Sequence, residues 1–165
     1  MRADKLYLVG FMGAGKTTLA RALGRRLDWE VRDLDEMIEA RERCTVADVF
    51  ARRGEPYFRI IEREVLRQAL ALRPAVVATG GGTYVDPDNR TQINGDGLVL
   101  WLDLPLALAL DRVPNDGRRP LAADRVQFEA LYRQRRLAYQ LAHLRLDAAP
   151  PVEELVEQVL DWLEH

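Results

Sequence analysis

The chain has 165 residues, of which 48% are hydrophobic and 30% are charged. This length and balance predict one soluble globular domain with a full hydrophobic core and argue against a second full domain. The formal net charge of −2 gives no general attraction to nucleic acid or to an anionic membrane, so we expect small-molecule partners. The only cysteine, Cys44, excludes an internal disulfide, and no apolar run reaches the length of a membrane span. We therefore expect a cytoplasmic protein.

A predicted buried strand at 6–9 leads into a segment with the pattern of a phosphate-binding loop. Residues 10–17 read Gly-Phe-Met-Gly-Ala-Gly-Lys-Thr, which matches G-x-x-x-x-G-K-[ST]. Lys16 would reach the β- and γ-phosphates of a nucleotide, and the Thr17 hydroxyl would ligate Mg2+. Leucines at 19, 23 and 27 predict the helix whose N-terminus faces those phosphates. The candidate nucleotide-binding residues of this segment are Gly13, Ala14, Gly15, Lys16, Thr17 and Thr18.

An acidic pair follows the second predicted strand, at 29–32, and a helical segment through residue 40 comes after it. One residue separates Asp33 from Asp35, so both side chains would share one face of an extended strand end. One carboxylate would hold Mg2+ through water, and the other would orient a substrate hydroxyl or take its proton. The alternative is that the pair only caps the following helix.

The rest of the chain alternates predicted strands with predicted helices. A capping box from Thr45 to Asp48 opens a short helix that ends near Gly54, and Pro56 suits the first turn of the next helix. Later strands are predicted at 75–78, 98–102 and 144–146, and helices after Asp86, at Pro105, at about 128–142 and after Pro150-Pro151. The polar segment 114–125 is predicted to be a mobile surface loop. This alternation predicts a parallel sheet with helices on both faces.

Ligands of such folds bind at the carboxyl ends of the strands, so polar residues at those ends are expected to converge on one cleft. Besides the phosphate loop and the aspartate pair, the segments at those ends are Thr79 to Gly82, Asp103 and Asp147. The three glycines would offer backbone N–H groups to an anion or a polyol, although a flexible turn explains them equally well.

Three arginines are candidates for holding anionic groups. Arg59 and Arg135 each lie beside an apolar helical stripe, where a guanidinium group would grip a carboxylate in bidentate fashion. Arg119 lies in the predicted surface loop and would move onto a transferring phosphate. Spacing alone leaves a solvated surface position as the alternative for all three.

Taken in order, these motifs resemble the shikimate kinase family over nearly the whole chain. The resemblance rests on residues 10–17, Asp-Leu-Asp at 33–35, Gly-Glu-Pro-Tyr-Phe-Arg at 54–59 with Glu62, Gly-Gly-Gly at 80–82, Arg-Pro-Leu at 119–121, and Arg135 four residues before Tyr139. It implies an α/β fold like that of nucleoside monophosphate kinases, with a five-stranded parallel sheet, a helical substrate-binding segment at about 33–62 and a mobile lid at about 114–125. Residues 1–165 would form one kinase domain.

The resemblance also implies an activity, which is transfer of the ATP γ-phosphate to the 3-hydroxyl of shikimate on the way to chorismate and the aromatic amino acids. By motif, Thr17 and Asp33 would serve Mg2+, and Lys16, Asp35 and Arg119 would be catalytic. The acceptor would bind to Asp35, to the backbone of Gly80, Gly81 and Gly82, and with its carboxylate to Arg59 and Arg135. Arg119 would also contact ATP as the lid arginine, and Arg112 and the segment 147–151 would lie against adenine.

Two of these assignments stay open. The interval from Arg119 to Arg135 is a few residues shorter than is usual in the family, so Arg136 competes with Arg135 for the carboxylate. Arg118 competes with Arg119 in the same way for the lid role.

Other functions also fit part of the pattern. A kinase of another hydroxy acid or sugar acid, such as gluconate, would keep the phosphate loop and the acidic pair. A nucleotide-binding module without turnover is a second alternative, although the sequence has no Asn-Lys-x-Asp motif of a GTPase switch. No feature signals an obligate interface, so a monomer is expected by default.

Overall fold

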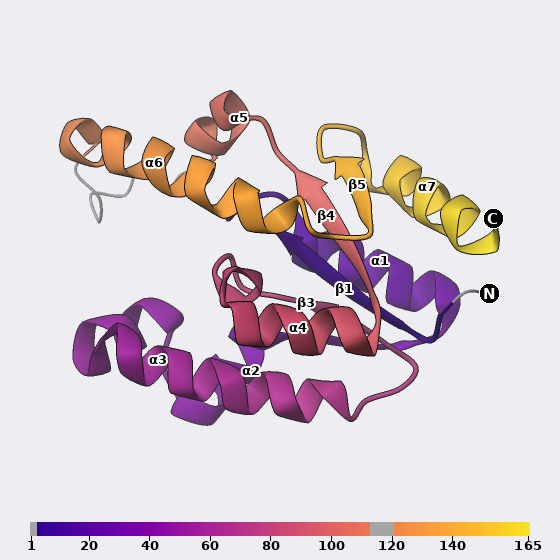
Figure 1. Ribbon diagram of the computed structural model, residues 1–165, viewed down its shortest axis with the longest axis horizontal. Helices are drawn as coiled ribbons and strands as arrows, with labels where there is room; N and C mark the ends of the chain where they lie inside the picture. Colours follow the sequence, from indigo (N-terminus) through magenta and orange to yellow (C-terminus); the bar gives the residue numbers. More distant parts are fainter. Residues whose placement is uncertain (1–2, 113–120) are drawn as a thin grey trace.

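The computed structural model describes residues 3–112 and 121–165, and of residues 121–124 only the backbone. Strands and helices alternate along the chain (Figure 1). The strands are β1 (Lys5–Gly10), β2 (Glu30–Asp33), β3 (Ala75–Ala78), β4 (Leu98–Asp103) and β5 (Leu144–Asp147). The helices are α1 (Lys16–Leu27), α2 (Leu34–Glu42), α3 (Val46–Leu70), α4 (Pro87–Asp96), α5 (Leu106–Asp111), α6 (Leu121–Tyr139) and α7 (Val152–Glu164), and a short 3-10 helix, η1, spans Thr83–Val85.

Within the described ranges, the strands form one five-stranded sheet in the order β2-β3-β1-β4-β5, and every neighbouring pair is parallel. The predicted architecture is confirmed. β1 lies at the centre, paired with β3 on one side and with β4 on the other. In sheets of this kind the ligand crevice lies at the carboxyl ends of the strands, beside the strand where the order reverses. The phosphate loop follows β1 and therefore lies at that point.

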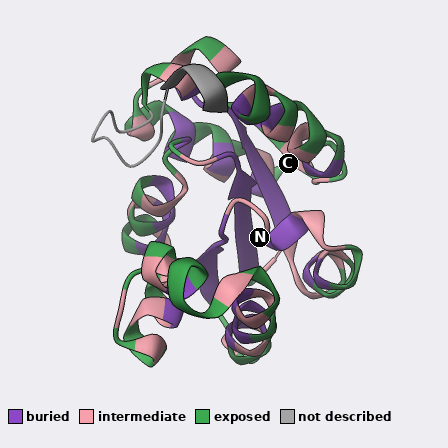
Figure 2. Ribbon diagram, turned by 90° about the vertical axis from the view of Figure 1, so that its left-hand side faces the viewer, coloured by how far each residue is buried: buried purple, intermediate pink, exposed green. Residues whose placement is uncertain are grey.

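Helices cover both faces of the sheet (Figure 1). α1 packs against β1, β3 and α7, while α4 and α6 pack on the opposite face against β4 and β1, and α3 packs against α4. Because both faces are covered, strands can be continuously apolar, and every residue of β1 and β3 is buried. Figure 2 shows this buried sheet between helices whose outer surfaces are exposed. In the described ranges no helix combines the length and apolarity needed to cross a membrane.

Local sequence signals set several helix ends. The Thr45 hydroxyl accepts a hydrogen bond from the Asp48 N–H at 3.1 Å, and the Asp48 carboxylate accepts one from the Thr45 N–H at 3.4 Å, which completes the predicted capping box. Gly54 has a φ of 82°, which favours glycine, and it divides α3 where a break is predicted. Asp86 caps α4 as predicted, since its carboxylate accepts from the Asp88 N–H at 2.8 Å.

The prediction of a loop at 114–125 is wrong at its C-terminal end. α6 begins at Leu121, so residues 121–125 are helical and the predicted start at 128 is too late. Residues 121–125 are Leu-Ala-Ala-Asp-Arg, and leucine, alanine and arginine are strong helix formers. The prediction of a loop relied on the polar composition of the segment and gave too little weight to these residues. Residues 113–120, which include most of the predicted lid, lie outside the described residues.

A buried lysine ties α3 to the sheet, a feature that the sequence did not predict. Lys5 of β1 is fully buried, and its ammonium donates to the carbonyls of Ala69, at 2.5 Å, and Leu72. Asp96, at 3.5 Å, supplies a counter-charge. The ammonium thereby adds a second donor to the Ala69 carbonyl, which also accepts from the Leu72 N–H at 3.1 Å, and binds the Leu72 carbonyl just beyond the C-terminal end of α3.

Candidate active site

The phosphate-binding loop joins the carboxyl end of β1 to the N-terminus of α1. Gly13 and Gly15 have φ values of 80° and 95°, which side chains rarely allow, so glycine is needed at both positions. A Cβ on Gly10 would lie 2.7 Å from the Leu102 carbonyl oxygen of β4. The path of the loop therefore requires the glycines of the motif. The loop leads directly into the N-terminus of α1, where backbone N–H groups have no partner within the helix.

Lys16 begins α1 and folds back onto the loop. Its ammonium donates to the Gly10 carbonyl at 2.5 Å and to the Phe11 carbonyl at 3.2 Å. Removal from water lowers the pKa of Lys16 to about 8, against an opposing effect of the Asp35 carboxylate. Phosphate oxygens would compete well for this ammonium, because hydrogen bonds between two charged groups are stronger than those to a neutral carbonyl.

Thr17 and Asp33 face each other across the end of β2. The Thr17 hydroxyl donates to one oxygen of Asp33, and the other oxygen accepts from the Glu36 N–H at 3.0 Å. Asp33 thus caps α2, as the alternative interpretation predicted, and at the same time points a carboxylate at the phosphate loop. One alcohol and one carboxylate fit Mg2+, which keeps several waters and takes its remaining ligands from substrate phosphates.

Asp35 lies in the first turn of α2. The prediction of an extended strand end carrying both aspartates is therefore wrong, because Asp33 ends the strand and caps a helix that begins at the next residue. Burial raises the pKa of Asp35 to about 6, helped by the Asp33 charge and opposed by Lys16. A carboxylate with this pKa is still ionised at neutral pH and is a better proton acceptor than an ordinary aspartate.

The turn at Gly80-Gly81-Gly82, after β3, lies against three of the candidate side chains. A Cβ on the first glycine would lie 2.9 Å from an Asp35 carboxylate oxygen, and one on the second 2.7 Å from Arg135 Nη1. A Cβ on the third would lie 2.7 Å from Arg59 Nη2. A Cβ at any of the three positions would therefore displace the end of one of these side chains. The fold thus brings an acid and two arginines from α2, α3 and α6 around one turn.

α6 directs Arg135 and Arg136 to different places. Arg135 lines the same cavity as the glycine turn, and its guanidinium lies 5.7 Å from the centroid of the Phe11 ring. Arg136 forms an ion pair with Asp103 and lies 4.8 Å from the centroid of the Trp101 ring, at the end of β4. The geometry therefore favours Arg135 over Arg136 as the arginine available to a ligand.

Arg59 is held by a buried glutamate. Arg59 Nη1 lies 2.8 Å from Glu62 Oε1, and the Glu62 side chain is only 1% exposed. Burial lowers the pKa of Arg135, and the positive charge of Arg59 lowers it further, although Tyr139 opposes both effects. Two guanidinium groups at one end of the cavity are suited to an anion, whose charge would offset their repulsion.

Asp35, Arg59, Arg135 and the glycine turn line a cavity of about 1320 Å³, and Met12 of the phosphate loop also lines it. Lys16, Thr17 and Asp33 are not among its lining residues. Its volume exceeds the roughly 300–1,000 Å³ of a pocket for one small molecule, so it has room for more than one ligand. Arg125, within the helical end of the predicted lid, also lines it. The apolar part of the wall includes Val46, Ala47, Phe50, Phe58, Phe128 and Leu131.

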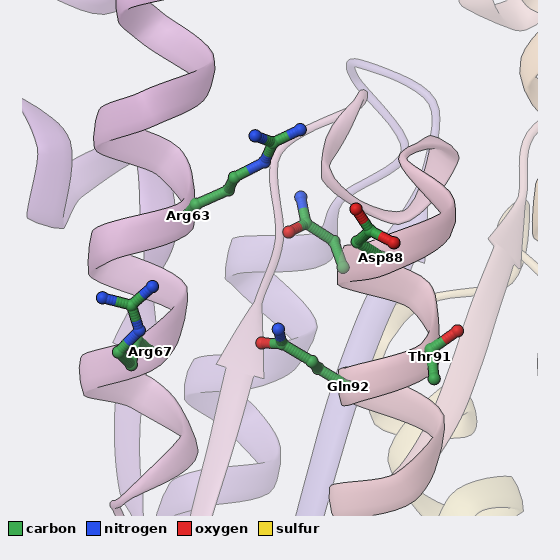
Figure 3. Close-up of a pocket in the computed structure, with 6 residues that line it drawn as sticks. Arg63, Arg67, Asp88, Thr91 and Gln92 are labelled. Atoms are coloured by element: carbon green, nitrogen blue, oxygen red, sulfur yellow. The ribbon is translucent and has the colours of Figure 1, made fainter.

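A second cavity, of about 360 Å³, lies between α3 and α4 (Figure 3). It shares no lining residue with the first and contains none of the predicted site residues. Arg63, on its α3 side, is held at 2.8 Å by Asp86, and the Asn89 amide donates to the Thr83 carbonyl at 3.2 Å. Of the two cavities, only the larger is lined by residues predicted to bind the acceptor, which are Asp35, Arg59, Arg135 and the glycines at 80–82.

The remaining predicted site residues lie in several places. Arg112 donates to the Gly13 carbonyl at 2.6 Å and so lies against the phosphate loop. Arg118 and Arg119 lie outside the described residues. Asp103 and Asp147, predicted to face the cleft, do not line the larger cavity: Asp103 binds Arg136 and Arg145, and Asp147 accepts from the Ala149 N–H at 2.9 Å.

Comparison with known proteins identifies the family. The family model described as shikimate kinase matches residues 12–164. A shikimate kinase of Sulfurihydrogenibium sp. is 36% identical over 157 residues, covering 94% of this chain and 95% of the relative. The chain belongs to the shikimate kinase family. Solved structures of shikimate kinases are similar as well. The structure from Aquifex aeolicus has a TM-score of 0.89 and 31% sequence identity, and the match covers 97% of this chain and 96% of that one. The structure from Acinetobacter baumannii in complex with shikimate has a TM-score of 0.88 and 34% identity, and the match covers 96% of this chain and 92% of that one.

Two polar side chains at the shikimate kinase cavity were part of the sequence motifs but received no role from them. Glu62 pairs with Arg59 and lines the cavity, and the Tyr139 hydroxyl donates to the Gly81 carbonyl. The i, i+3 spacing of Arg59 and Glu62 is a recognisable signal of an ion pair on one helix face. The contact of Tyr139 joins α6 to the turn after β3, and no local pattern encodes it.

Proposed function

We propose that this protein transfers the γ-phosphate of ATP to the 3-hydroxyl of shikimate. The observation that carries the proposal is the glycine turn at 80–82, which places Asp35, Arg59 and Arg135 together in a cavity next to a phosphate loop. An acid beside two arginines suits a hydroxy acid, whose hydroxyl and carboxylate need opposite kinds of partner.

The nucleotide half of the site consists of the phosphate loop and the start of α1. Backbone N–H groups of Gly13, Ala14 and Gly15, with Lys16, would hold the β- and γ-phosphates, and Thr17 and Thr18 would complete the contacts. Mg2+, held by Thr17 and Asp33, would neutralise charge on the phosphates when bound. Arg112, which already lies against the loop, would contact the adenine side of ATP.

The acceptor half lies at the other side of the cavity. Arg59 and Arg135 would bind the shikimate carboxylate, and the backbone of Gly80, Gly81 and Gly82 would approach the ring hydroxyls. Asp35 would accept a hydrogen bond from the reacting hydroxyl and take its proton as the oxygen attacks the γ-phosphorus. Lys16 would stabilise the charge that develops on the transferring phosphoryl group.

Further parts of the proposal concern the lid and the state of the protein. Residues 114–125 would form a lid whose arginine, Arg119 or its competitor Arg118, reaches the transferring phosphate, and residues 33–62 would form the substrate-binding segment. We propose that the protein works as a monomer in the cytoplasm, where it meets ATP, Mg2+ and shikimate and needs neither nucleic acid nor a membrane.

The test is ADP release by the purified protein with Mg-ATP, measured in one coupled assay with shikimate, with gluconate and without an acceptor. We expect turnover that depends on shikimate. Turnover with gluconate alone would make the protein a sugar-acid kinase. Nucleotide binding without acceptor-dependent turnover would favour a nucleotide-binding module.

Substitution of Arg59 tests the carboxylate contact. Arg59→Ala is expected to raise the shikimate KM about 100-fold, because hydrogen bonds between charged groups contribute about 1.5–3 kcal/mol each. The KM for ATP should change little. Arg63→Ala is the matched control, since Arg63 lies one turn further along α3 and binds Asp86 instead of facing the cavity. An unchanged shikimate KM in Arg59→Ala would remove Arg59 from the acceptor site.

A further inference from the structure

A chain of hydrogen bonds links the glycine turn to Arg59 through Thr83. The Gly80 N–H donates to Thr83 Oγ1 at 3.1 Å, and the Thr83 hydroxyl donates to Glu62 Oε2 at 2.9 Å. The other oxygen of Glu62 accepts from Arg59 Nη1 at 2.8 Å. Thr83 and Glu62 are 0% and 1% exposed, so water does not compete for these bonds. One hydroxyl therefore satisfies a buried backbone N–H and a buried carboxylate.

This arrangement restricts how Arg59 can move. Glu62 uses one oxygen for Thr83 and the other for Arg59, so rotating the carboxylate would break at least one charge-assisted hydrogen bond. Without the Thr83 hydroxyl, Glu62 loses one of its hydrogen bonds. The Arg59 guanidinium would then shift with Glu62, because its other contact with a carboxylate, from Nη2 to Glu55 Oε1, is longer, at 3.5 Å. The hydroxyl therefore acts on the orientation of Arg59 through Glu62.

The same hydroxyl also acts on the turn beside Asp35. A Cβ on Gly80 would lie 2.9 Å from an Asp35 oxygen and 3.3 Å from Thr83 Oγ1, so the three groups share one small space. Thr83 thus lies close to the group proposed for the reacting hydroxyl and is linked through Glu62 to the group proposed for the carboxylate. A hydroxy acid that binds to both must match the separation between them.

We propose that Thr83 is a positioning residue for the acceptor, which holds Arg59, through Glu62, at the place relative to Asp35 that the substrate carboxylate requires. The inference rests on the proposed binding of the acceptor carboxylate by Arg59. Thr83 itself contacts neither substrate in this scheme. Its effect is on acceptor binding, and it is specific to acceptors that carry a negative charge.

The test compares three substitutions at this position. Thr83→Val keeps the shape of the side chain and removes the hydroxyl, Thr83→Ala removes the hydroxyl without placing a second methyl beside Glu62, and Thr83→Ser keeps the hydroxyl. Both hydroxyl-free variants are expected to raise the shikimate KM about tenfold, the effect of losing one hydrogen bond to a charged group. kcat and the KM for ATP should stay within about twofold of the unsubstituted protein, and Thr83→Ser should restore the shikimate KM.

The methyl ester of shikimate separates positioning from a general structural effect. The ester lacks the negative carboxylate, so its KM should not rise further in Thr83→Val. A loosened fold would instead raise the KM of shikimate and of its ester alike. Thr79→Val is the matched control, because the Thr79 side chain is also buried but does not line the cavity, and its hydroxyl donates to the Leu8 carbonyl at 2.9 Å instead of to Glu62. It should lower thermal stability and leave the shikimate KM unchanged.

The outcomes distinguish this inference from the proposed function. If Arg59→Ala raises the shikimate KM and Thr83→Val does not, the role of Thr83 is overturned while the acceptor site stands. The role of Thr83 would also be overturned if Thr83→Val raised the KM of shikimate and of its ester equally, or if Thr79→Val raised the shikimate KM as much as Thr83→Val does. If Arg59→Ala leaves the shikimate KM unchanged, the acceptor assignment fails and the role of Thr83 fails with it.

Discussion

Replacing Lys16 by methionine is expected to lower kcat by about 10³-fold, because a preorganised positive group is lost where charge develops on the transferring phosphoryl group. Methionine keeps an unbranched stem of similar length, so the loop loses the ammonium and little volume. The ammonium binds the carbonyls of Gly10 and Phe11, so the loop holds it beside the place proposed for the phosphates. ATP affinity should fall as well, since Lys16 would contact the phosphates in the ground state.

Three quantities are measured: kcat with saturating shikimate and ATP, ATP affinity by calorimetry, and the temperature of thermal unfolding. Arg25→Met is the matched control, because Arg25 is an exposed basic residue on the same helix. It should leave all three quantities unchanged. A Lys16→Met variant that keeps more than about a tenth of the kcat would contradict the assigned role of Lys16.

Much of the fold could be predicted because its signals are local. The capping box at Thr45 and Asp48, the break at Gly54 and the cap at Asp86 each involve residues within one helical turn, and each occurs in the structure. The strands were recognisable because a sheet covered on both faces needs continuous apolar runs. The phosphate loop was predictable because its signal is also local: the backbone needs positive φ values at several positions, and glycine adopts these most easily.

Features that depend on how distant segments meet could not be predicted. Arg135 and Arg136 are neighbours in the chain, and only the rotation of α6 about its axis decides which one lines the cavity. Asp103 ends a strand, as Asp33 does, but it forms ion pairs with Arg136 and Arg145 and does not line the larger cavity. Lys5 shows the same limit, because its partners lie more than sixty residues away, at the end of α3.

Asp35→Asn is the second substitution with a large expected effect. It should lower kcat by about 10²–10⁴-fold, the usual contribution of a general base, because the amide cannot accept the proton of the acceptor hydroxyl. Glu36→Gln is the matched control, since Glu36 is the next residue of α2, is exposed and binds Arg21. A kcat for Asp35→Asn close to that of the control would assign Asp35 to orientation of the hydroxyl alone.

The pH dependence of kcat/KM gives an independent test of Asp35. Its pKa is raised to about 6, so the ionised base disappears as the pH falls through 6, and kcat/KM for shikimate should drop about tenfold for each further pH unit. The pKa of Lys16 is lowered to about 8, so kcat/KM for ATP should also fall as the pH rises through 8. Asp35→Asn should remove the acid limb and keep the basic one. An acid limb that survives in Asp35→Asn would belong to another group.

The same raised pKa separates loss of activity from loss of structure. In the folded protein Asp35 holds its proton more tightly than an ordinary aspartate, whose pKa is 3.8. Its contribution to the free energy of unfolding therefore declines as the pH rises from about 4 to 6, and it stays low above pH 6. Asparagine does not ionise and avoids this cost. Above pH 6, Asp35→Asn should therefore unfold at a temperature no lower than the unsubstituted protein, while its kcat is far lower. This opposition is what a functional carboxylate in a desolvated site requires, because the burial that makes Asp35 basic also destabilises its charge. A variant that lost activity and thermal stability together would place Asp35 in the framework of the fold instead of in the reaction.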